Sequence, residues 1–134
     1  MYYPGSRQDT TFISHTNYIC SYAFSYNRYL ETLGFSIAEE QFDFVIEDNA
    51  IIGCNNLTLI NLMMAGVIYI ANLSNNAIKD PFGGRYKSLT ILCMPEGADE
   101  NGNRYNATIY SWIEALNFSI NSETSGYKIQ MQIN

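Results

Sequence analysis

A long stretch in the middle of the chain, from Asn49 to Ile78, contains no charged side chain. Within it, Leu57–Leu73 is almost wholly apolar, with Thr58, Asn61 and Asn72 as its strongly polar members. Such a segment is kept from water either in a protein core or in a bilayer. The two asparagines would need hydrogen-bond partners in lipid, and no belt of Lys, Arg or Trp flanks the segment. We therefore expect buried core here and no membrane span.

Two structures are open to this segment. The pair Ala65-Gly66 divides it into Leu57–Met64 and Val67–Leu73, which predicts a hairpin of two strands that are buried on both faces. The competing interpretation is one buried helix over the whole of Leu57–Leu73, because periodicity alone does not separate the two for short apolar runs.

Alternation of apolar and polar residues predicts strands in most of the remaining chain. The clearest case is Tyr127–Asn134, in which every second residue is apolar. Aromatic and β-branched residues predict further strands at Phe12–Tyr26 and Ser88–Met94. Arg104–Ile120 reads as one long strand or as two strands with a bend.

Turn residues separate these strands. Glu47-Asp48-Asn49 predicts a hairpin between Phe42–Ile46 and Ala50–Gly53, since Asp and Asn tolerate the left-handed conformation of tight turns. The Asn-Gly pair within Asp99–Asn103 predicts a second hairpin tip.

A short helix is expected within Asn27–Gln41, where Ser36 and Glu39 fit a capping box. We see no linker and no internal repeat in the sequence, so we expect one domain over residues 1–134. About seven to nine short strands with regular turns predict a mainly β fold. The predicted fold is a single-domain antiparallel β-sandwich, jelly roll or barrel with one short helix.

No cluster of residues gives a strong signal for catalysis or for metal or cofactor binding. Asp99–Asn103 matches the first half of a calcium loop, but Arg104 and Tyr110 stand where Gly and Glu are required. The pair Gly83-Gly84 lacks the rest of a phosphate-binding pattern, and His15 is the single histidine. The three cysteines are widely spaced, which favours free buried thiols. We predict no catalytic residue, no cofactor and no metal site.

The composition favours a protein that contacts other protein chains. Charged residues make up 15% of the chain, against about 25% in an ordinary soluble domain. The formal charge of −6 argues against sequence-specific or general nucleic-acid binding, which needs a basic footprint. Interface cores are poor in Lys and Glu and rich in Tyr, of which this chain has 11. The aromatic residues expected to face partners are Tyr2, Tyr3, Tyr18, Tyr22, Tyr26, Tyr29 and Trp112.

These features together predict a non-enzymatic structural subunit that packs on copies of itself or on other structural proteins. The N-terminus shows no signal peptide, so we expect synthesis in a host cytoplasm and a final location in a virion. The particle favoured is a bacteriophage, with the chain as a minor capsid, vertex, head-fibre or tail-connector component. The alternative is a β-sandwich module that binds a carbohydrate or another small ligand on an aromatic face. An enzyme is the third possibility.

Overall fold

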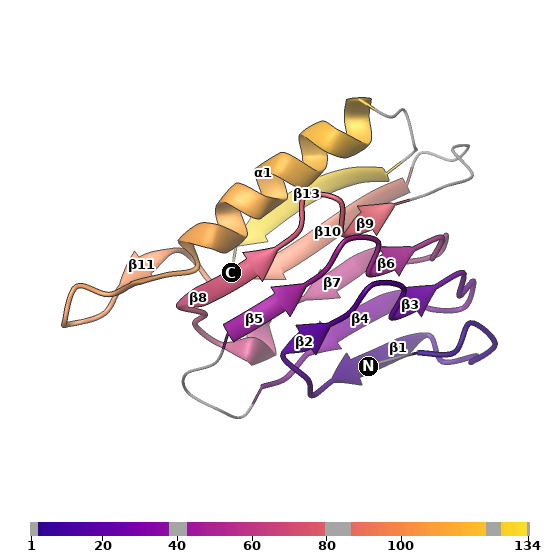
Figure 1. The fold of residues 1–134 in the computed structure, drawn as a ribbon, viewed down its shortest axis with the longest axis horizontal. Coiled ribbons are helices and arrows are strands. Elements are labelled where there is room, and N and C mark those ends of the chain that lie inside the picture. The colour runs from indigo at the N-terminus through magenta and orange to yellow at the C-terminus, as the bar shows by residue number, and fades with distance from the viewer. Residues whose placement is uncertain (1–2, 38–42, 80–86, 123–126, 134) are drawn as a thin grey trace.

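From β1 to β10, successive strands of the chain pass from one sheet to the next instead of pairing with each other (Figure 1). The first three strands, β1 (Thr11–Ser14), β2 (Tyr18–Ile19) and β3 (Phe24–Ser25), lie in three different sheets. The chain then returns in β4 (Thr32–Phe35), which pairs with β1 in parallel. One such circuit is a coil, and the next circuit stacks on it in the same way.

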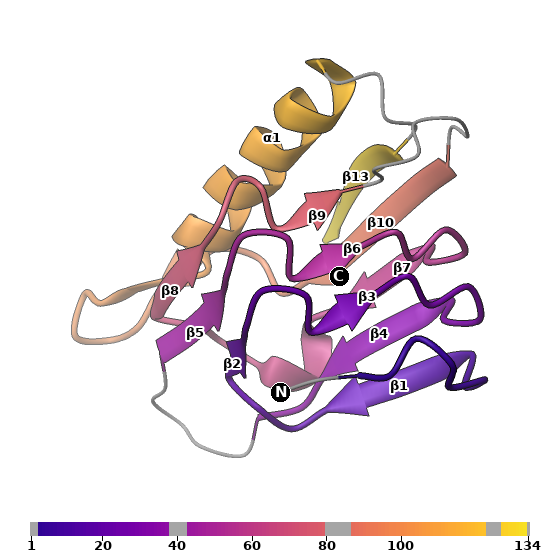
Figure 2. The same cartoon turned by 45° about the vertical axis from the view of Figure 1, so that its right-hand side comes forward.

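Three parallel sheets surround a common core as a result (Figures 1 and 2). Their strand orders are β1-β4-β7-β10-β13, β2-β5-β8 and β3-β6-β9, and we call them the long, middle and short-strand sheets. The computed structural model describes residues 3–37, 43–79, 87–122 and 127–133. Its other elements are β5 (Asp43–Ile46), β6 (Ile51–Ile52), β7 (Leu59–Asn61), the 3-10 helix η1 (Met63–Ala65), β8 (Ile70–Leu73), β9 (Ile78–Lys79), β10 (Lys87–Cys93), β11 (Gly97–Ala98), β12 (Arg104–Tyr105), α1 (Ala107–Ser122) and β13 (Tyr127–Ile133).

The prediction of a mainly β fold with one helix is correct, but the predicted antiparallel sandwich, jelly roll or barrel is wrong. All three large sheets are parallel, and only the β11–β12 ribbon is antiparallel among the described strands. Short apolar strands separated by tight turns are compatible with both architectures. A turn that folds the chain back makes a hairpin, whereas here the turn directs it around a corner into another sheet.

The corner that follows each strand of the middle sheet is a four-residue turn that occurs three times. The N–H groups of Ala23, Ala50 and Ala77 donate to the C=O groups of Cys20, Glu47 and Ser74, at 3.1, 3.3 and 3.2 Å. All three alanines have 0% of their surface exposed, and they lie 27 residues apart. Because each turn stacks directly on the next, the inward position has room for only a small side chain.

Larger side chains stack with the same 27-residue spacing, so the chain has an internal repeat, which we did not expect from the sequence. Phe24, Ile51 and Ile78 are paired or aligned in register on the short-strand sheet and are all buried. The repeat is hidden because only the apolar character of its core positions recurs. In addition, the long sheet spaces its coils unevenly, with Thr11 opposite Thr32 and Leu59 opposite Thr90.

Helix α1 closes one end of the stack (Figure 2). It contacts β8 and β13, and its residues Ile109, Trp112, Ile113 and Leu116 are buried. The indole Nε1 of Trp112 donates to the C=O of Ser74, at 2.8 Å. The helix thus covers core that a further coil would otherwise cover, as the terminal caps of repeat proteins do.

The helix of the structure, α1, lies in a different part of the chain from the predicted helix. Arg104–Ile120 was predicted as strand, but Ala107–Ser122 is helical, with its β-branched and aromatic residues turned toward the core at a helical spacing. Tertiary packing of that apolar face overrides the strand propensity of its residues. Conversely, Thr32–Phe35 of the predicted helix Asn27–Gln41 is strand β4, and its capping-box residue Glu39 lies outside the described residues.

Several local predictions are confirmed. Ser88–Met94 and Tyr127–Asn134 correspond to β10 and β13, and Asp99–Asn103 is the tip of the β11–β12 hairpin. The predicted hairpins at Glu47–Asn49 and at Ala65-Gly66 are wrong in their pairing, since β5 and β6, like β7 and β8, belong to different sheets. The competing single helix over Leu57–Leu73 is also wrong, because strands β7 and β8 occupy it, with η1 between them.

The other end of the stack is held by the buried amide of Asn27. Its Nδ2 donates to the C=O groups of Pro4 and Arg7, at 3.2 and 2.9 Å. Its Oδ1 accepts from the N–H groups of Tyr29 and Leu30, at 2.8 and 2.9 Å. One side chain therefore fixes the N-terminal segment to the turn between the first two coils.

Asn27→Ala should lower the free energy of unfolding by about 3 kcal/mol, because it leaves buried backbone groups without partners. Asn55 lies in the equivalent turn one coil later, and its buried Oδ1 accepts no hydrogen bond from any described residue. Asn55→Ala is thus the matched control, with an expected loss below about 1 kcal/mol. Urea unfolding of both variants checks this, and equal losses would contradict the assigned role of Asn27.

Candidate functional site

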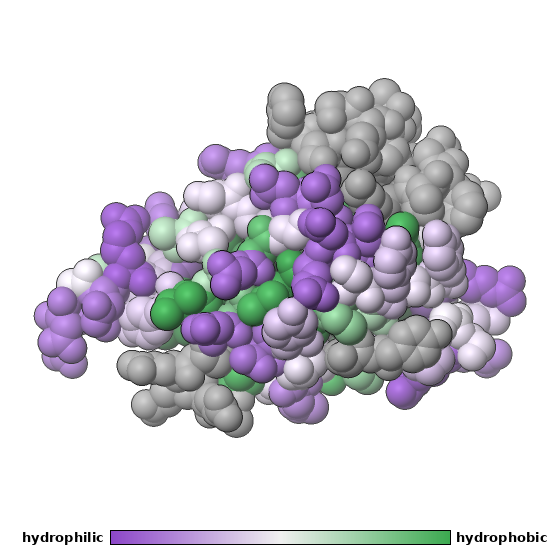
Figure 3. All heavy atoms as spheres, viewed as in Figure 1, coloured by the Kyte–Doolittle hydropathy of each residue, from purple (hydrophilic) through white to green (hydrophobic). Residues whose placement is uncertain are grey.

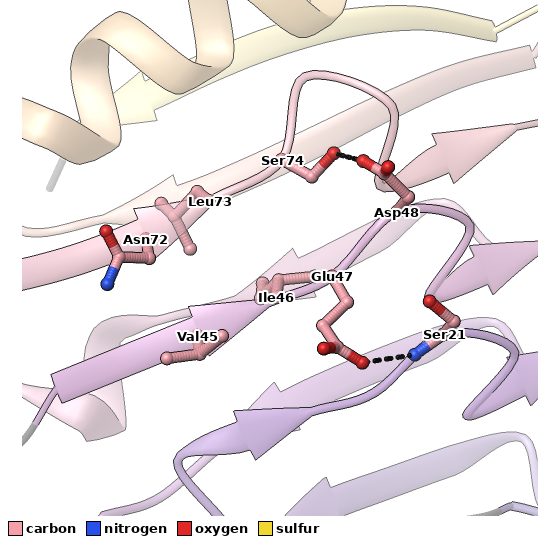
Figure 4. Close-up of a pocket in the computed structure, with 8 residues that line it drawn as sticks. All are labelled: Ser21, Val45, Ile46, Glu47, Asp48, Asn72, Leu73 and Ser74. Carbon is pink, nitrogen blue, oxygen red and sulfur yellow. Dashed lines mark hydrogen bonds between the residues drawn. The ribbon is translucent and has the colours of Figure 1, made fainter.

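A shallow depression of about 500 Å³ lies on the outer side of the middle sheet, where β5 and β8 reach their corner turns (Figure 4). Its polar lining comes from the turns themselves, and its apolar floor comes from the strands. The lining residues are Ser21, Val45, Ile46, Glu47, Asp48, Asn72, Leu73 and Ser74. Equivalent turns of successive coils therefore bring together residues that are far apart in the sequence.

Glu47 is the best-anchored polar residue of this depression. Its Oε2 accepts from the hydroxyl of Tyr18 at 2.7 Å, and its Oε1 accepts from the N–H of Ser21 at 3.0 Å. These two hydrogen bonds lower the pKa of Glu47 below its ordinary value, and the bond from the Tyr18 hydroxyl is the larger cause. The same bond to Glu47 raises the pKa of Tyr18. The carboxylate is thus held ionised and in a fixed position.

Asp48, the second carboxylate, binds the hydroxyl of Ser74 in the next turn (Figure 4). The two acids are consecutive, and both are engaged by neighbouring coils instead of facing each other across an open site. Among the described residues, no group of three His, Cys, Asp or Glu side chains is placed to hold a metal ion. The arrangement can accept hydrogen bonds from a polar ligand, and it also ties the coils to one another.

Figure 3 shows the side of the molecule on which this depression lies. It is mostly hydrophilic, with a hydrophobic area over β5 and β8. On β8, the side chain of Ile70 is 57% exposed. The apolar surface here is interrupted by polar side chains, so it is not a continuous apolar face.

A different surface, the outer face of the long sheet, carries no charge on β1, β4, β7 and β10, whereas on the fifth strand, β13, Lys128 is in register with Ser88 of β10. Inward residues such as Leu33, Phe35 and Ile60 are buried, so the residues between them face outward. The outward residues form two rows in register, Thr11-Thr32-Leu59-Thr90 and Ile13-Gly34-Asn61-Leu92. A row of uncharged side chains across four strands is unusual for a sheet face exposed to water.

Gly34 lies at the centre of this outer face, in contact with two exposed apolar side chains. A Cβ at Gly34 would lie 3.4 Å from Cε of Met64 and 3.5 Å from Cγ1 of Ile13. Met64 is 45% exposed and Ile13 is 41% exposed. Because the glycine has no side chain, Met64 and Ile13 both lie close to the same point above it.

The structure separates the aromatic residues that were predicted to face partners. Tyr18, Tyr22 and Tyr26 are each about half exposed, at the middle sheet and at the corners. Tyr26 rests on Gly53 of the next coil, where a Cβ would lie only 2.6 Å from its ring. Tyr29 is half-buried, with the guanidinium of Arg28 5.0 Å from its ring centroid.

Tyr3 and Trp112 lie in the core instead, with 1% and 2% of their surface exposed, so they offer no surface to a partner in this fold. Burial and a hydrogen bond to Asp9 raise the pKa of Tyr3 to about 12. Tyr2 lies outside the described residues, as does the Gly83-Gly84 loop. The outer-face residues Thr32, Gly34 and Leu92 were missed, although their alternation with buried neighbours is visible in the sequence.

The remaining sequence motifs have structural explanations. Oδ1 of Asp99 accepts from the N–H groups of Asn101 and Asn103, each at 2.9 Å, which closes the hairpin tip. The three cysteines form no disulfide in the described part of the chain, and Cys54 and Cys93 are buried. His15 is exposed, with its Nδ1 3.2 Å from the C=O of Ser36. No helix in the described part of the chain is long and apolar enough to cross a membrane.

The fold places the chain in the class of parallel β-solenoids, here with a helix in its last coil. The chain matches no protein-family model, no curated protein and no solved structure at a significant level.

The bond between Tyr18 and Glu47 makes stability depend on pH. The pKa of Glu47 is lower in the folded chain than its ordinary value of 4.5, so its carboxylate stabilises the fold above that value. This contribution is lost as the pH falls through the folded pKa. The difference in unfolding free energy between wild type and Glu47→Gln should therefore shrink between about pH 7 and about pH 3.

Urea unfolding at both pH values measures this difference, with Tyr18→Phe as the control. Because the Tyr18 hydroxyl is the largest cause of the lowered pKa, Tyr18→Phe should weaken the pH dependence. A difference that stays constant or grows on acidification would contradict the assignment.

Proposed function

We propose that the protein is a non-enzymatic structural subunit that assembles with other protein chains, and that its assembly is a bacteriophage particle. The observation that carries this proposal is the uncharged outer face that β1, β4, β7 and β10 form in the long sheet, with Ile13 and Met64 both beside Gly34. Interfaces are depleted of charge at their centres, and flat sheet faces without charge are prone to association.

The position of the charged residues supports the same proposal. Glu47, Asp48, Asp99 and Arg104 lie at corners or on the β11–β12 ribbon, away from the outer face of the long sheet. These four charged residues thus lie where they stay wet when the face of β1, β4 and β7 is covered, whereas Lys87 and Lys128 lie on β10 and β13 at the other side of the sheet. A binding surface with an uncharged centre and a polar rim has this distribution.

Lysines placed on the outer face should weaken the association that takes place through this face. In the double variant Thr90→Lys, Leu92→Lys, both charges lie on β10, away from the β1 edge. Ile70→Lys, Asn72→Lys is the matched control, with the same spacing on the outer side of the middle sheet. We expect wild type and control to self-associate in sedimentation experiments, with an affinity at least about tenfold above that of the β10 variant. A wild-type chain that stays monomeric at high concentration would count against the proposal.

The depression at Glu47 favours a second candidate function, the binding of a carbohydrate or another small polar ligand. Fixed carboxylates beside apolar and aromatic side chains are typical of sugar contacts. Its test is a glycan array followed by NMR titration of the responding sugar. This function requires chemical-shift changes at Ser21 and Asn72 that disappear in Glu47→Gln.

A further inference from the structure

One edge of the long sheet is open at the N-terminal end of the stack. The C=O groups of Thr10 and Ser14 accept from the N–H groups of Thr32 and Ser36, at 2.9 Å each. Because successive backbone groups of a strand point to opposite sides, residues 12 and 14 bond to β4 and residues 11 and 13 point away from it. Among the described residues, the backbone groups of Thr11 and Ile13 have no partner, and both residues are exposed.

The neighbouring sheet edges at this end are protected, whereas β1 is not. The hydroxyl of Thr16 accepts from the N–H of Tyr18 at 3.3 Å and lies 3.5 Å from its C=O, so the β2 edge is partly satisfied locally. The β3 edge is covered by Tyr3, which bridges to Phe24 in parallel. Natural edge strands usually carry Lys, Pro or a bulge to prevent pairing, and β1 (Thr-Phe-Ile-Ser) has none of these.

We infer that two copies of the chain pair through β1 about a two-fold axis, antiparallel and centred on Phe12. This inference rests on the proposed function, since it identifies a partner for the assembling subunit. In this register Thr11 lies opposite Ile13 of the second copy, and the same pair forms again on the other side of the axis. Each pair exchanges two N–H···O=C bonds, and no other register joins both open residues twice.

The shape of this end fits the same symmetry. The chain advances from sheet to sheet along the stack, so the end is a step and not a plane (Figure 2). Tyr3 adds a strand position beyond β3, whereas nothing described lies beyond β2. A two-fold axis perpendicular to the sheet at Phe12 exchanges the N-terminal and C-terminal ends of β1. It therefore places the segment at Tyr3 of one copy over the recessed β2 of the other.

A head-to-tail stack of copies fits less well. In that arrangement β1 of one copy would pair with β13 of the next, and its β2 would have to extend the middle sheet beyond β8. Helix α1 already lies against β8, with Trp112 bonded to Ser74. The two-fold pair is therefore closed and leaves the α1 end out of the contact.

The two-fold pair also doubles the area of the outer face that is open to a partner. With strands about 4.8 Å apart and about 3.3 Å per residue, the outer face of one long sheet covers roughly 300 Å². A stable interface buries about 800 Å² on each partner. Pairing through β1 makes one continuous sheet of twice the width, so the two faces form a single larger docking surface.

Disulfide cross-linking tests the pairing and its register. Thr11→Cys and Ile13→Cys are made separately in a Cys20→Ser background, which removes the half-buried thiol. Opposed residues of a bonded antiparallel pair have Cα atoms about 5.5 Å apart, within disulfide range. We expect a cross-linked dimer when the two variants are mixed and oxidised, and none with either variant alone.

Thr11→Pro provides a second measurement, since it removes an N–H that β4 does not use, at the first position of the strand. It should leave the circular dichroism spectrum unchanged and raise the dimer dissociation constant at least tenfold, because two symmetry-related bonds are lost. The β10 double-lysine variant is the control for the sheet face and should still cross-link.

The outcomes separate this inference from the proposed function. Mixed-variant cross-links that Thr11→Pro weakens support the β1 pair. Self-association without these cross-links, or equal cross-linking of each variant with itself, overturns the β1 pair and leaves the structural-subunit proposal standing. Head-to-tail filaments would likewise overturn the two-fold pair. A chain that is monomeric at all concentrations overturns both.

Discussion

The structure depends on the stacking of equivalent residues in successive coils. Ala23, Ala50 and Ala77 set how closely the corner turns approach, and backbone bonds run from turn to turn. Tyr22 donates to Asn49 and Asn49 donates to Asn76, each at 2.9 Å, so the hydrogen-bonded ladder continues through the corners. A coil cannot bury its apolar side alone and is stabilised by its neighbours. The first and last coils consequently need caps. The N-terminal segment that Asn27 holds covers the first coil in part, and helix α1 covers the last.

The outer surfaces follow from the same stacking. Every outward position of a strand is repeated one coil later, so one choice of side chain becomes a row. Uncharged residues in two such rows make the face of the long sheet, and the Glu47 and Asp48 turns make the polar depression on the middle sheet. The two surfaces differ in what their side chains contribute to the stability of the fold. The carboxylates of the depression are engaged in bonds between coils, whereas Ile13 and Met64 are exposed beside Gly34 without a role in the core.

Sequence patterns predicted the strands better than they predicted how the strands pair. Apolar alternation located β10 and β13, and the Asn-Gly tip located the β11–β12 ribbon, since these depend on local residue types. The turn after β5 looked like a hairpin because Asn49, at φ 57°, has the conformation of hairpin turns as well. Only the 27-residue recurrence of Ala50 with Ala23 and Ala77 distinguishes a corner from a hairpin. The helix was misassigned because Trp112 and Leu116 fit a strand face as well as a helix face.

The candidate site was predictable in kind but not in position. The scarcity of charge predicted a covered surface, and of the tyrosines proposed for it Tyr18, Tyr22 and Tyr26 are exposed, whereas Tyr3 packs in the core against Phe12 and Phe24. Which uncharged residues share a face depends on the register between coils, and that register joins residues 21 to 31 positions apart. The open edge of β1 is even harder to predict from the sequence, because it depends on which backbone groups of β1 no neighbouring strand pairs with. A solenoid end that retains an uncharged edge next to an uncharged face has kept two features that promote association, and evolution removes such features from chains that remain alone.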